Sequence, residues 1–160
     1  MITNSAILSS IEHIRALPEK LETALRGMQD RELDTPYRDG GWTVRQVVHH
    51  LADSHANAFI RMKLVVTEDC PLLKPYYQDA WATLPDGSQL PVEYSLQILR
   101  GLHAKWAYML DHLSDEHLAR TGNHLDDGEV TLEQLIKGYA RHGIEHVAQI
   151  NRLREKMGWI

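Results

Sequence analysis

Apolar residues recur at three- and four-residue steps in four long stretches of the chain, which predicts four amphipathic helices. These stretches run from about Ser5 to Met28, from Thr43 to about Val66, from about Val92 to Leu113, and from Thr131 onward. The second and fourth stretches each open on a Thr with a Gln three residues later, the pattern of a capping box. Within the first stretch, Pro18 predicts a kink or a break, because proline has no N–H to donate inside a helix.

The connections between these helices contain turn-forming and polar residues. Residues 34–41 are typical of a turn, and the segment from Thr67 to Pro91 holds four prolines, so we expect it to be irregular with one short helical turn near Ala80. A polar connection runs from Ser114 to Val130, and no alternating strand pattern longer than a few residues occurs. The sequence therefore predicts an all-α fold, a single four-helix bundle domain over residues 1–160. Its long connections either cross between helices or build a site at one end.

Composition excludes several classes of protein. The 160 residues are 43% hydrophobic and 24% charged, which is ordinary for one globular domain. The net charge of −5 lacks the excess of basic residues that is typical of proteins that bind nucleic acid. No apolar run is long enough to span a membrane. Without a secretion signal at the N-terminus, we expect a cytoplasmic protein. Cys70 is the only cysteine, which excludes an internal disulfide and a cysteine-rich zinc site.

The ten histidines are the most informative residues, because some of them fall on apolar helix faces. In the fourth helix, His142 and His146 lie four residues apart on the predicted core side, where both rings can reach one metal ion. The alternative is that the two are partly buried rings held by ordinary hydrogen bonds.

The second helix adds His50 on the flank of its apolar face, with Ser54, Asn57 and Arg61 continuing the same polar stripe. This stripe is either a helix edge at the bundle surface or one wall of a polar cavity. One histidine from this helix and two from the fourth would give three neutral nitrogen ligands, an arrangement typical of a catalytic metal site with open positions. Imidazole suits zinc, nickel, copper and iron.

The other histidines are interpreted from their places on the same helical wheels. His103 faces inward, as a core residue or a neighbour of the site rather than a ligand, and His55 lies at the apolar edge and is left undecided. The remaining five are expected to face solvent: His13, His49, His112, His117 and His124.

The stretch from His142 to His146 also matches the His-x-x-Glu-His pattern of inverted zinc peptidases, in which Glu145 would be the general base. The pattern is short, and peptidases that carry it are much larger proteins. We therefore do not favour a peptidase, although Glu145 stays a candidate catalytic residue together with Arg61.

A longer set of residues resembles the YfiT-like branch of the DinB superfamily. The main match is the run from Thr35 to His55, TPYRDGGWTVRQVVHHLADSH. Shorter matches are Arg61–Leu64, Thr67–Glu68, Pro75–Tyr76, Ala80–Trp81, Leu102–His103 with Trp106, the pair His142 and His146, and Met157–Trp159. The resemblance implies an up-down-down-up four-helix bundle, often a homodimer. It also implies a divalent metal ion, nickel or zinc, held by His50, His142 and His146.

Members of that branch are metal-dependent hydrolases or enzymes that transfer low-molecular-weight thiols such as bacillithiol. The resemblance thus implies a small-molecule substrate and either an activated water or an activated thiol as the nucleophile, and of the two it favours thiol transfer. Ser54, Asn57 and His103 are candidates to contact the bound cofactor and orient the substrate, and the segment from Thr67 to Pro91 is expected to cover the site. Two alternatives stay open: a non-enzymatic bundle with His103 or His55 as a fourth ligand, and a metal-free bundle with structural histidines.

Overall fold

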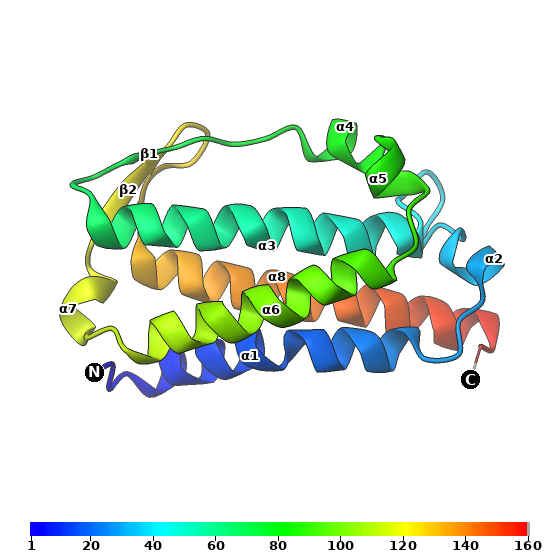
Figure 1. The fold of residues 1–160 in the computed structure, drawn as a ribbon, viewed down its shortest axis with the longest axis horizontal. Coiled ribbons are helices and arrows are strands. Elements are labelled where there is room, and N and C mark those ends of the chain that lie inside the picture. Colours follow the sequence, from blue (N-terminus) through cyan, green and yellow to red (C-terminus); the bar gives the residue numbers. More distant parts are fainter. Residues whose placement is uncertain (160) are drawn as a thin grey trace.

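The computed structural model describes residues 1–159, and it is a four-helix bundle, as the hydrophobic pattern predicts (Figure 1). The long helices are α1 (Ser5–Leu25), α3 (Val44–Thr67), α6 (Glu93–Asp111) and α8 (Leu132–Met157). Four short helices lie in the connections: α2 (Asp30–Leu33), α4 (Gln78–Ala82), α5 (Pro85–Ser88) and α7 (Asp115–Leu118).

The long helices are arranged so that consecutive ones are not always neighbours. Helices α1 and α3 each pack against both α6 and α8. Since α3 and α6 run in the same direction, the chain between them must return along the whole length of the bundle (Figure 1). Helix α3 alone is about 36 Å long at the usual rise per residue. This parallel pair explains why the segment after Thr67 is so long.

The helix termini follow the sequence signals closely. Thr43 caps α3 with Gln46, and Thr131 caps α8 with Gln134, so both predicted capping boxes are present. Of the kink or break expected at Pro18, the break does not occur: α1 continues through Pro18 and ends at Leu25. Pro18 is buried in the bundle, and packing of its ring offsets the single missing helical hydrogen bond.

A small sheet lies in the connections, which the sequence did not predict. It contains β1 (Leu72–Leu73), β2 (Thr121–His124) and β3 (Gly128–Thr131), with β1 parallel and β3 antiparallel to β2. Strands of two to four residues are too short to give a recognisable alternating pattern. The tight turn of the β2–β3 hairpin uses Gly128 at φ 77°, a conformation that favours glycine.

Side chains from the hairpin region fasten this sheet to the end of α3. Arg120 donates to the backbone carbonyls of Val65 at 2.8 Å and of Glu68 at 2.5 Å, which the last turn of the helix leaves without helical partners. Gly122 lies so close to Leu73 and Val65 that a Cβ atom there would be 2.8 Å from the Leu73 side chain. The hairpin is therefore held over the C-terminal end of α3.

The core consists of two apolar clusters with a polar layer between them. One cluster includes Ile14 of α1 and Trp106 of α6, and the other includes Leu17 of α1 and Leu99 of α6. Between these levels lies a layer of buried polar side chains, among them His55 and His103. Burying polar groups is costly unless they are hydrogen-bonded, so this layer is where a function is to be sought.

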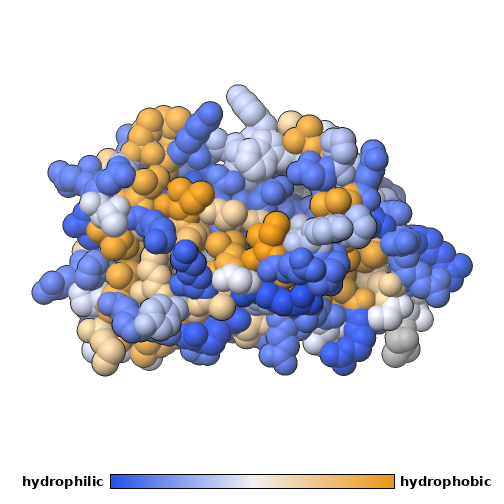
Figure 2. All heavy atoms as spheres, in the orientation of Figure 1, coloured by the Kyte–Doolittle hydropathy of each residue, from blue (hydrophilic) through white to orange (hydrophobic). Residues whose placement is uncertain are grey.

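On the face of the molecule seen in Figure 1, hydrophobic side chains reach the surface in several places and hydrophilic side chains separate them (Figure 2). Within residues 1–159, none of the helices is both long and apolar enough to cross a membrane.

Candidate metal centre

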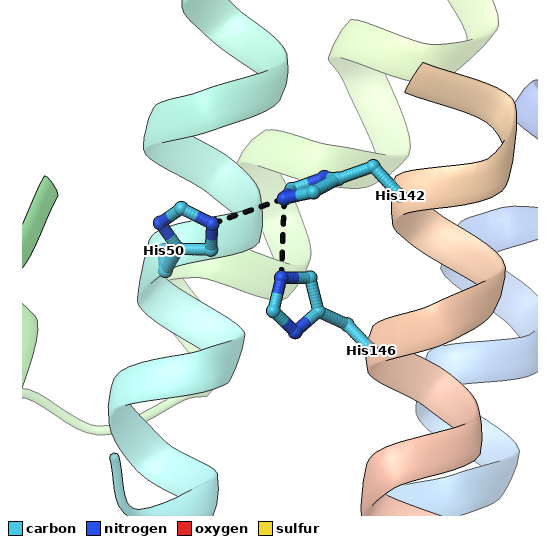
Figure 3. A group of neighbouring side chains, drawn as sticks. All are labelled: His50, His142 and His146. Carbon is cyan, nitrogen blue, oxygen red and sulfur yellow. Dashed lines mark hydrogen bonds between the residues drawn. The ribbon is translucent and has the colours of Figure 1, made fainter. Parts of the chain in front are cut away.

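Three histidine side chains converge between α3 and α8 (Figure 3). His50 projects from α3, and His142 and His146 project from successive turns of α8. The Nε2 atom of His142 lies 3.1 Å from the Nε2 atom of His50 and 3.1 Å from the Nε2 atom of His146. Each ring offers a nitrogen within 4.8 Å of the other two. The structure thus brings together the three histidines that the sequence selects.

A line of imidazoles continues from this cluster into the core. Nδ1 of His142 lies 3.1 Å from Nε2 of His55, and Nδ1 of His55 lies 2.9 Å from Nε2 of His103. Nδ1 of His103 donates to the backbone carbonyl of Ile14 at 2.5 Å. We call His142, His55 and His103 the histidine relay. Because His55 and His103 are fully buried, these contacts supply partners that water cannot.

The carbonyl of Ile14 fixes the direction of every hydrogen bond in the relay, because a carbonyl oxygen can only accept. A neutral imidazole carries one proton, so His103 donates from Nδ1 and accepts at Nε2 from His55. By the same rule, His55 accepts at Nε2 from Nδ1 of His142. The Nε2 atom of His142 is therefore left with a lone pair directed at the other two histidines.

The Nε2 atom of His146 also carries a free lone pair, but a different residue orients its ring. Its Nδ1 lies 2.9 Å from the side-chain carbonyl oxygen of Gln149, which accepts the proton and leaves a lone pair on Nε2. Two lone pairs that face each other at 3.1 Å repel unless a cation lies between them. Two imidazole nitrogens bound to one tetrahedral zinc ion at about 2.0–2.1 Å lie about 3.3 Å apart. The donor set and its spacing therefore fit a divalent metal ion.

Burial keeps these rings in the neutral form that binds metal. It lowers the pKa of His50 to about 3, with the positive charges that His142 and His146 would carry as further causes. Burial likewise lowers the pKa of His142 to about 3, with His146 as the further cause. The pKa of His146 is also lowered by burial, although its hydrogen bond to Gln149 opposes the shift. At neutral pH no proton has to leave these nitrogens before an ion binds.

A cavity of about 930 Å³ borders the cluster at His142. Its walls come from α3, from residues 75–80, from the β2–β3 hairpin region and from the first half of α8. Tyr76 and Tyr77 line it, and Trp81 packs on the ring of Tyr76 with the ring centroids 4.6 Å apart. Part of the segment between α3 and α6 thus lies over the site, as the sequence led us to expect.

Residues 13–150 match the family model described as DinB superfamily. The chain belongs to the DinB superfamily. A relative from Bacillus cereus (strain AH820), named "Putative metal-dependent hydrolase", is 49% identical over 158 residues, which cover 99% of this chain and 91% of the relative. A relative of the same name from Bacillus mycoides (strain KBAB4) is 48% identical with the same coverage.

Solved structures of similar proteins agree with this assignment to the DinB superfamily. YfiT from Bacillus subtilis, described as a probable metal-dependent hydrolase with an unusual four-helix bundle topology, matches with a TM-score of 0.96 at 43% identity. That match covers 100% of this chain and 92% of YfiT. TT2238, a four-helix bundle protein, matches with a TM-score of 0.62 at 17% identity, over 91% of this chain and 98% of TT2238. The second likeness is one of fold alone.

The other residues selected from the sequence occupy different places in this DinB domain. Ser54 and Arg61 are buried and line the cavity. Glu145 also borders the cavity, but its side chain is 61% exposed and lies 3.5 Å from Arg141, so it sits at the rim. Asn57 is half-buried and donates to the carbonyl of Asp53 within α3 rather than lining the cavity. His103 belongs to the histidine relay.

Two of the histidines expected at the surface are not there. His49 is 3% exposed, with Nδ1 2.7 Å from the hydroxyl of Ser95 and Nε2 2.8 Å from the carbonyl of Leu90. The chain that returns before α6 covers one side of α3. The hydrophobic pattern of α3 predicts that this side faces solvent. The side chain of His124 is 11% exposed and lines the cavity, because β2 pairs on both sides.

Three further residues near the site received no definite role from the sequence argument. His55 is fully buried in the histidine relay. Its position at the apolar edge of α3 did not show whether it faces the core or solvent. Tyr139 packs against the apolar core, yet its hydroxyl accepts a hydrogen bond from Arg61 at 2.7 Å. Tyr76 belongs to the segment from Thr67 to Pro91 that was expected to cover the site, but no periodicity in this irregular segment shows which way its side chain points.

Proposed function

We propose that this protein is a metal-dependent hydrolase that acts on a small molecule at a divalent ion, nickel or zinc, held by His50, His142 and His146. One observation carries the proposal: the Nε2 atoms of His50 and of His146 each lie 3.1 Å from Nε2 of His142, so three imidazole rings meet at one point. The names of the relatives from Bacillus, which describe metal-dependent hydrolases, support the same reaction class.

The residues of the chain have distinct roles in this proposal. When bound, a divalent ion with three neutral ligands supplies a Lewis acid that lowers the pKa of a water molecule or thiol toward neutrality. The histidine relay holds the ring of His142 with its lone pair toward the ion, and Gln149 does the same for His146. The cavity bordered by His142 has the volume of a typical small-molecule site, and Ser54 and Arg61 lie in its wall to orient the substrate.

Glu145 is our candidate for a general base, although at the rim it would act on a proton that is close to solvent. Its side chain is 61% exposed, and its neighbour Arg141 lies 3.5 Å away. A Glu145→Gln variant tests this role, because it keeps the shape of the side chain and removes the carboxylate. If Glu145 is the base, kcat falls while metal content stays at the wild-type level.

Transfer of a small-molecule thiol is the second reaction that the same donor set supports. A thiol would then be the nucleophile, and it would have to come from a bound cofactor. Cys70 is the only cysteine of the chain, it is exposed, and it is not one of the residues of the three-histidine cluster. Assays of thiol consumption run beside assays of ester hydrolysis distinguish the two reactions.

A purely structural metal is the main alternative, and the number of protein ligands bears on it. Structural zinc sites are usually closed by four protein ligands, whereas catalytic sites keep an open position. Among residues 1–159, the group that can hold an ion contains His50, His142 and His146 and no fourth member. His55 and His103, the suspected fourth ligands, use both ring nitrogens in the relay. This favours a catalytic role.

The decisive experiment combines elemental analysis with activity assays on protein purified without a His tag. We expect about one equivalent of transition metal in the wild type, its loss in His50→Ala and His142→Ala, and loss of ester hydrolysis with it. The matched control is His112→Ala, which removes an exposed histidine at the end of α6. Wild-type protein with only a small fraction of an equivalent of metal, or equal activity in wild type and His142→Ala, would refute the proposal.

The expected homodimer and the expected cytoplasmic location also stay predictions. The exposed free thiol of Cys70 is compatible with a reducing compartment. Light scattering on the purified protein measures the oligomeric state directly.

A further inference from the structure

Arg61 is a buried cation in the wall of the cavity beside the metal centre. The residue is 8% exposed, and its guanidinium donates to the hydroxyl of Tyr139 at 2.7 Å and to the backbone carbonyl of Lys74 at 2.5 Å. Both acceptors are neutral. Among the ion pairs formed by residues 1–159, none involves Arg61.

This arrangement differs from that of the other buried arginine of the protein. Arg45 is 5% exposed, and its guanidinium lies 2.6 Å from a carboxylate oxygen of Asp34 and 3.2 Å from one of Asp30. A buried charge is costly unless an opposite charge compensates it, and Arg45 follows that rule. Arg61 has five N–H donors and gives two hydrogen bonds, so donors are left for a ligand.

We propose that the substrate of this site carries a carboxylate, which binds the guanidinium of Arg61 while its reacting group lies toward His142. This inference rests on the proposed function and adds the substrate class. Tyr139 connects the two positions: its hydroxyl accepts from Arg61, and the centroid of its ring lies 6.2 Å from that of His142. Arg61 and His142 both line the cavity, so one small molecule can contact both.

Other groups in the wall suit a carboxylate held by Arg61. The hydroxyl of Tyr76 is buried in the wall beside Ser54, and its O–H group donates no hydrogen bond to a described residue, so it is available as a donor. Burial raises the pKa of Tyr76 to about 12, which keeps that proton in place. The tyrosine rings of the wall also provide apolar surface for the body of the ligand.

Exposed acidic residues at the rim disfavour a doubly charged ligand more than a singly charged one. The exposed cation Arg141 also lines the cavity, together with four exposed carboxylates: Asp79, Asp126, Asp127 and Glu145. Their field disfavours a doubly charged phosphate more than a singly charged carboxylate, because the Coulomb energy scales with the charge of the ligand. Being solvated, they do not neutralise Arg61, which is buried on the inner wall.

The test measures equilibrium binding of benzoate and of benzamide, which has nearly the same shape but no charge. Calorimetric titrations are run on zinc-loaded protein and on protein treated with chelator. A charged hydrogen-bonded pair leads us to expect that benzoate binds at least about tenfold more tightly than benzamide in both forms. In Arg61→Gln the two affinities should become about equal, and in Arg61→Lys part of the preference should remain.

Arg141→Gln is the matched control. Arg141 lies at the rim of the same cavity, and its side chain is 77% exposed. This variant should keep the wild-type preference for benzoate. Equal affinities in the wild type, no measurable binding of either compound, or an unchanged preference in Arg61→Gln would overturn the proposal. So would a preference that exists only in zinc-loaded protein and is unaffected by Arg61, since the carboxylate would then lie on the metal.

The design also separates this inference from the proposed function. Binding is measured without turnover and in metal-free protein, so an absence of catalysis or of bound metal leaves the benzoate result interpretable. If Arg61→Gln fails to fold, the wild-type preference and the Arg61→Lys variant still decide the outcome.

Discussion

Nδ1 of His142 lies 3.1 Å from Nε2 of His55, and this contact connects the metal centre to the core of the bundle. His55 is fixed in turn by His103, which donates to the backbone of α1 at Ile14. A backbone carbonyl that can only accept therefore determines which nitrogen of His142 is free for the ion. The ring of His142 is thus oriented by contacts that reach three other helices, although the three converging histidines come from α3 and α8.

Replacing His55 should weaken metal binding without abolishing it. In His55→Leu, Nδ1 of His142 loses its acceptor, and loss of such a supporting contact typically lowers metal affinity by about 10–100-fold. His55→Gln, whose carbonyl oxygen can accept the same proton, should recover part of the affinity. Competition with a chromogenic chelator gives the dissociation constants, with the exposed His112→Gln as control. Equal affinity in His55→Leu and wild type would show that the relay does not orient the ligand.

Metal should stabilise the fold by linking α3 to α8. An ion that binds only the native state at about 100 times its dissociation constant adds about 2.7 kcal/mol to the free energy of unfolding. Urea titrations of zinc-loaded and chelator-treated protein measure this difference. It should vanish in His50→Ala, because the ligand from α3 is then missing. A metal-dependent gain that persists in His50→Ala would place the ion elsewhere.

Two glycines of α8 should respond in opposite ways to a larger side chain. At Gly143 a Cβ atom would lie 2.8 Å from the side chain of Leu17 and 3.4 Å from His55. Gly143→Val should therefore cost about 1–3 kcal/mol of stability through overpacking. At Gly138 nothing lies within 4 Å of an added Cβ, so Gly138→Ala should gain about 0.5–1 kcal/mol from helix propensity. Thermal and urea unfolding measure both, and a stable Gly143→Val would contradict the close packing of α1 on α8.

Metal-free protein should lose stability as the pH falls below about 6.5. Burial lowers the pKa of His50 and of His142 to about 3, and that of His103 to about 4, from an ordinary value of 6.5. Between these values the unfolded chain binds protons that the folded chain does not. The free energy of unfolding should then fall by up to about 1.4 kcal/mol per pH unit for each histidine.

Urea unfolding of chelator-treated protein at pH 7 and pH 5 measures this slope. His103→Leu should reduce the slope, because one histidine with a lowered pKa is removed. Because burial also raises the pKa of Asp53 to about 6, which acts in the opposite direction, the comparison of slopes decides: an unchanged slope in His103→Leu would mean that His103 is protonated in the folded state.

The sequence by itself determined the four helices, their capping boxes at Thr43 and Thr131, and the inward direction of His142 and His146. These properties follow from the helical period and from contacts within one element, so they can be read along the chain. His50 was found in the same way, although its position on the flank of α3 fitted a surface edge equally well.

Only the tertiary structure decided which polar side chains are buried and what they contact. His49 is buried by the chain that returns before α6, His124 is partly covered by a sheet of very short strands, and the buried Arg61 donates to Tyr139 and Lys74. The order of the histidine relay likewise depends on Ile14, which lies 89 residues from His103 along the chain. Periodicity indicates which face of a helix turns inward, but the partner that a buried nitrogen finds depends on segments distant in sequence. The bundle brings these segments together because each of them buries its own apolar face there.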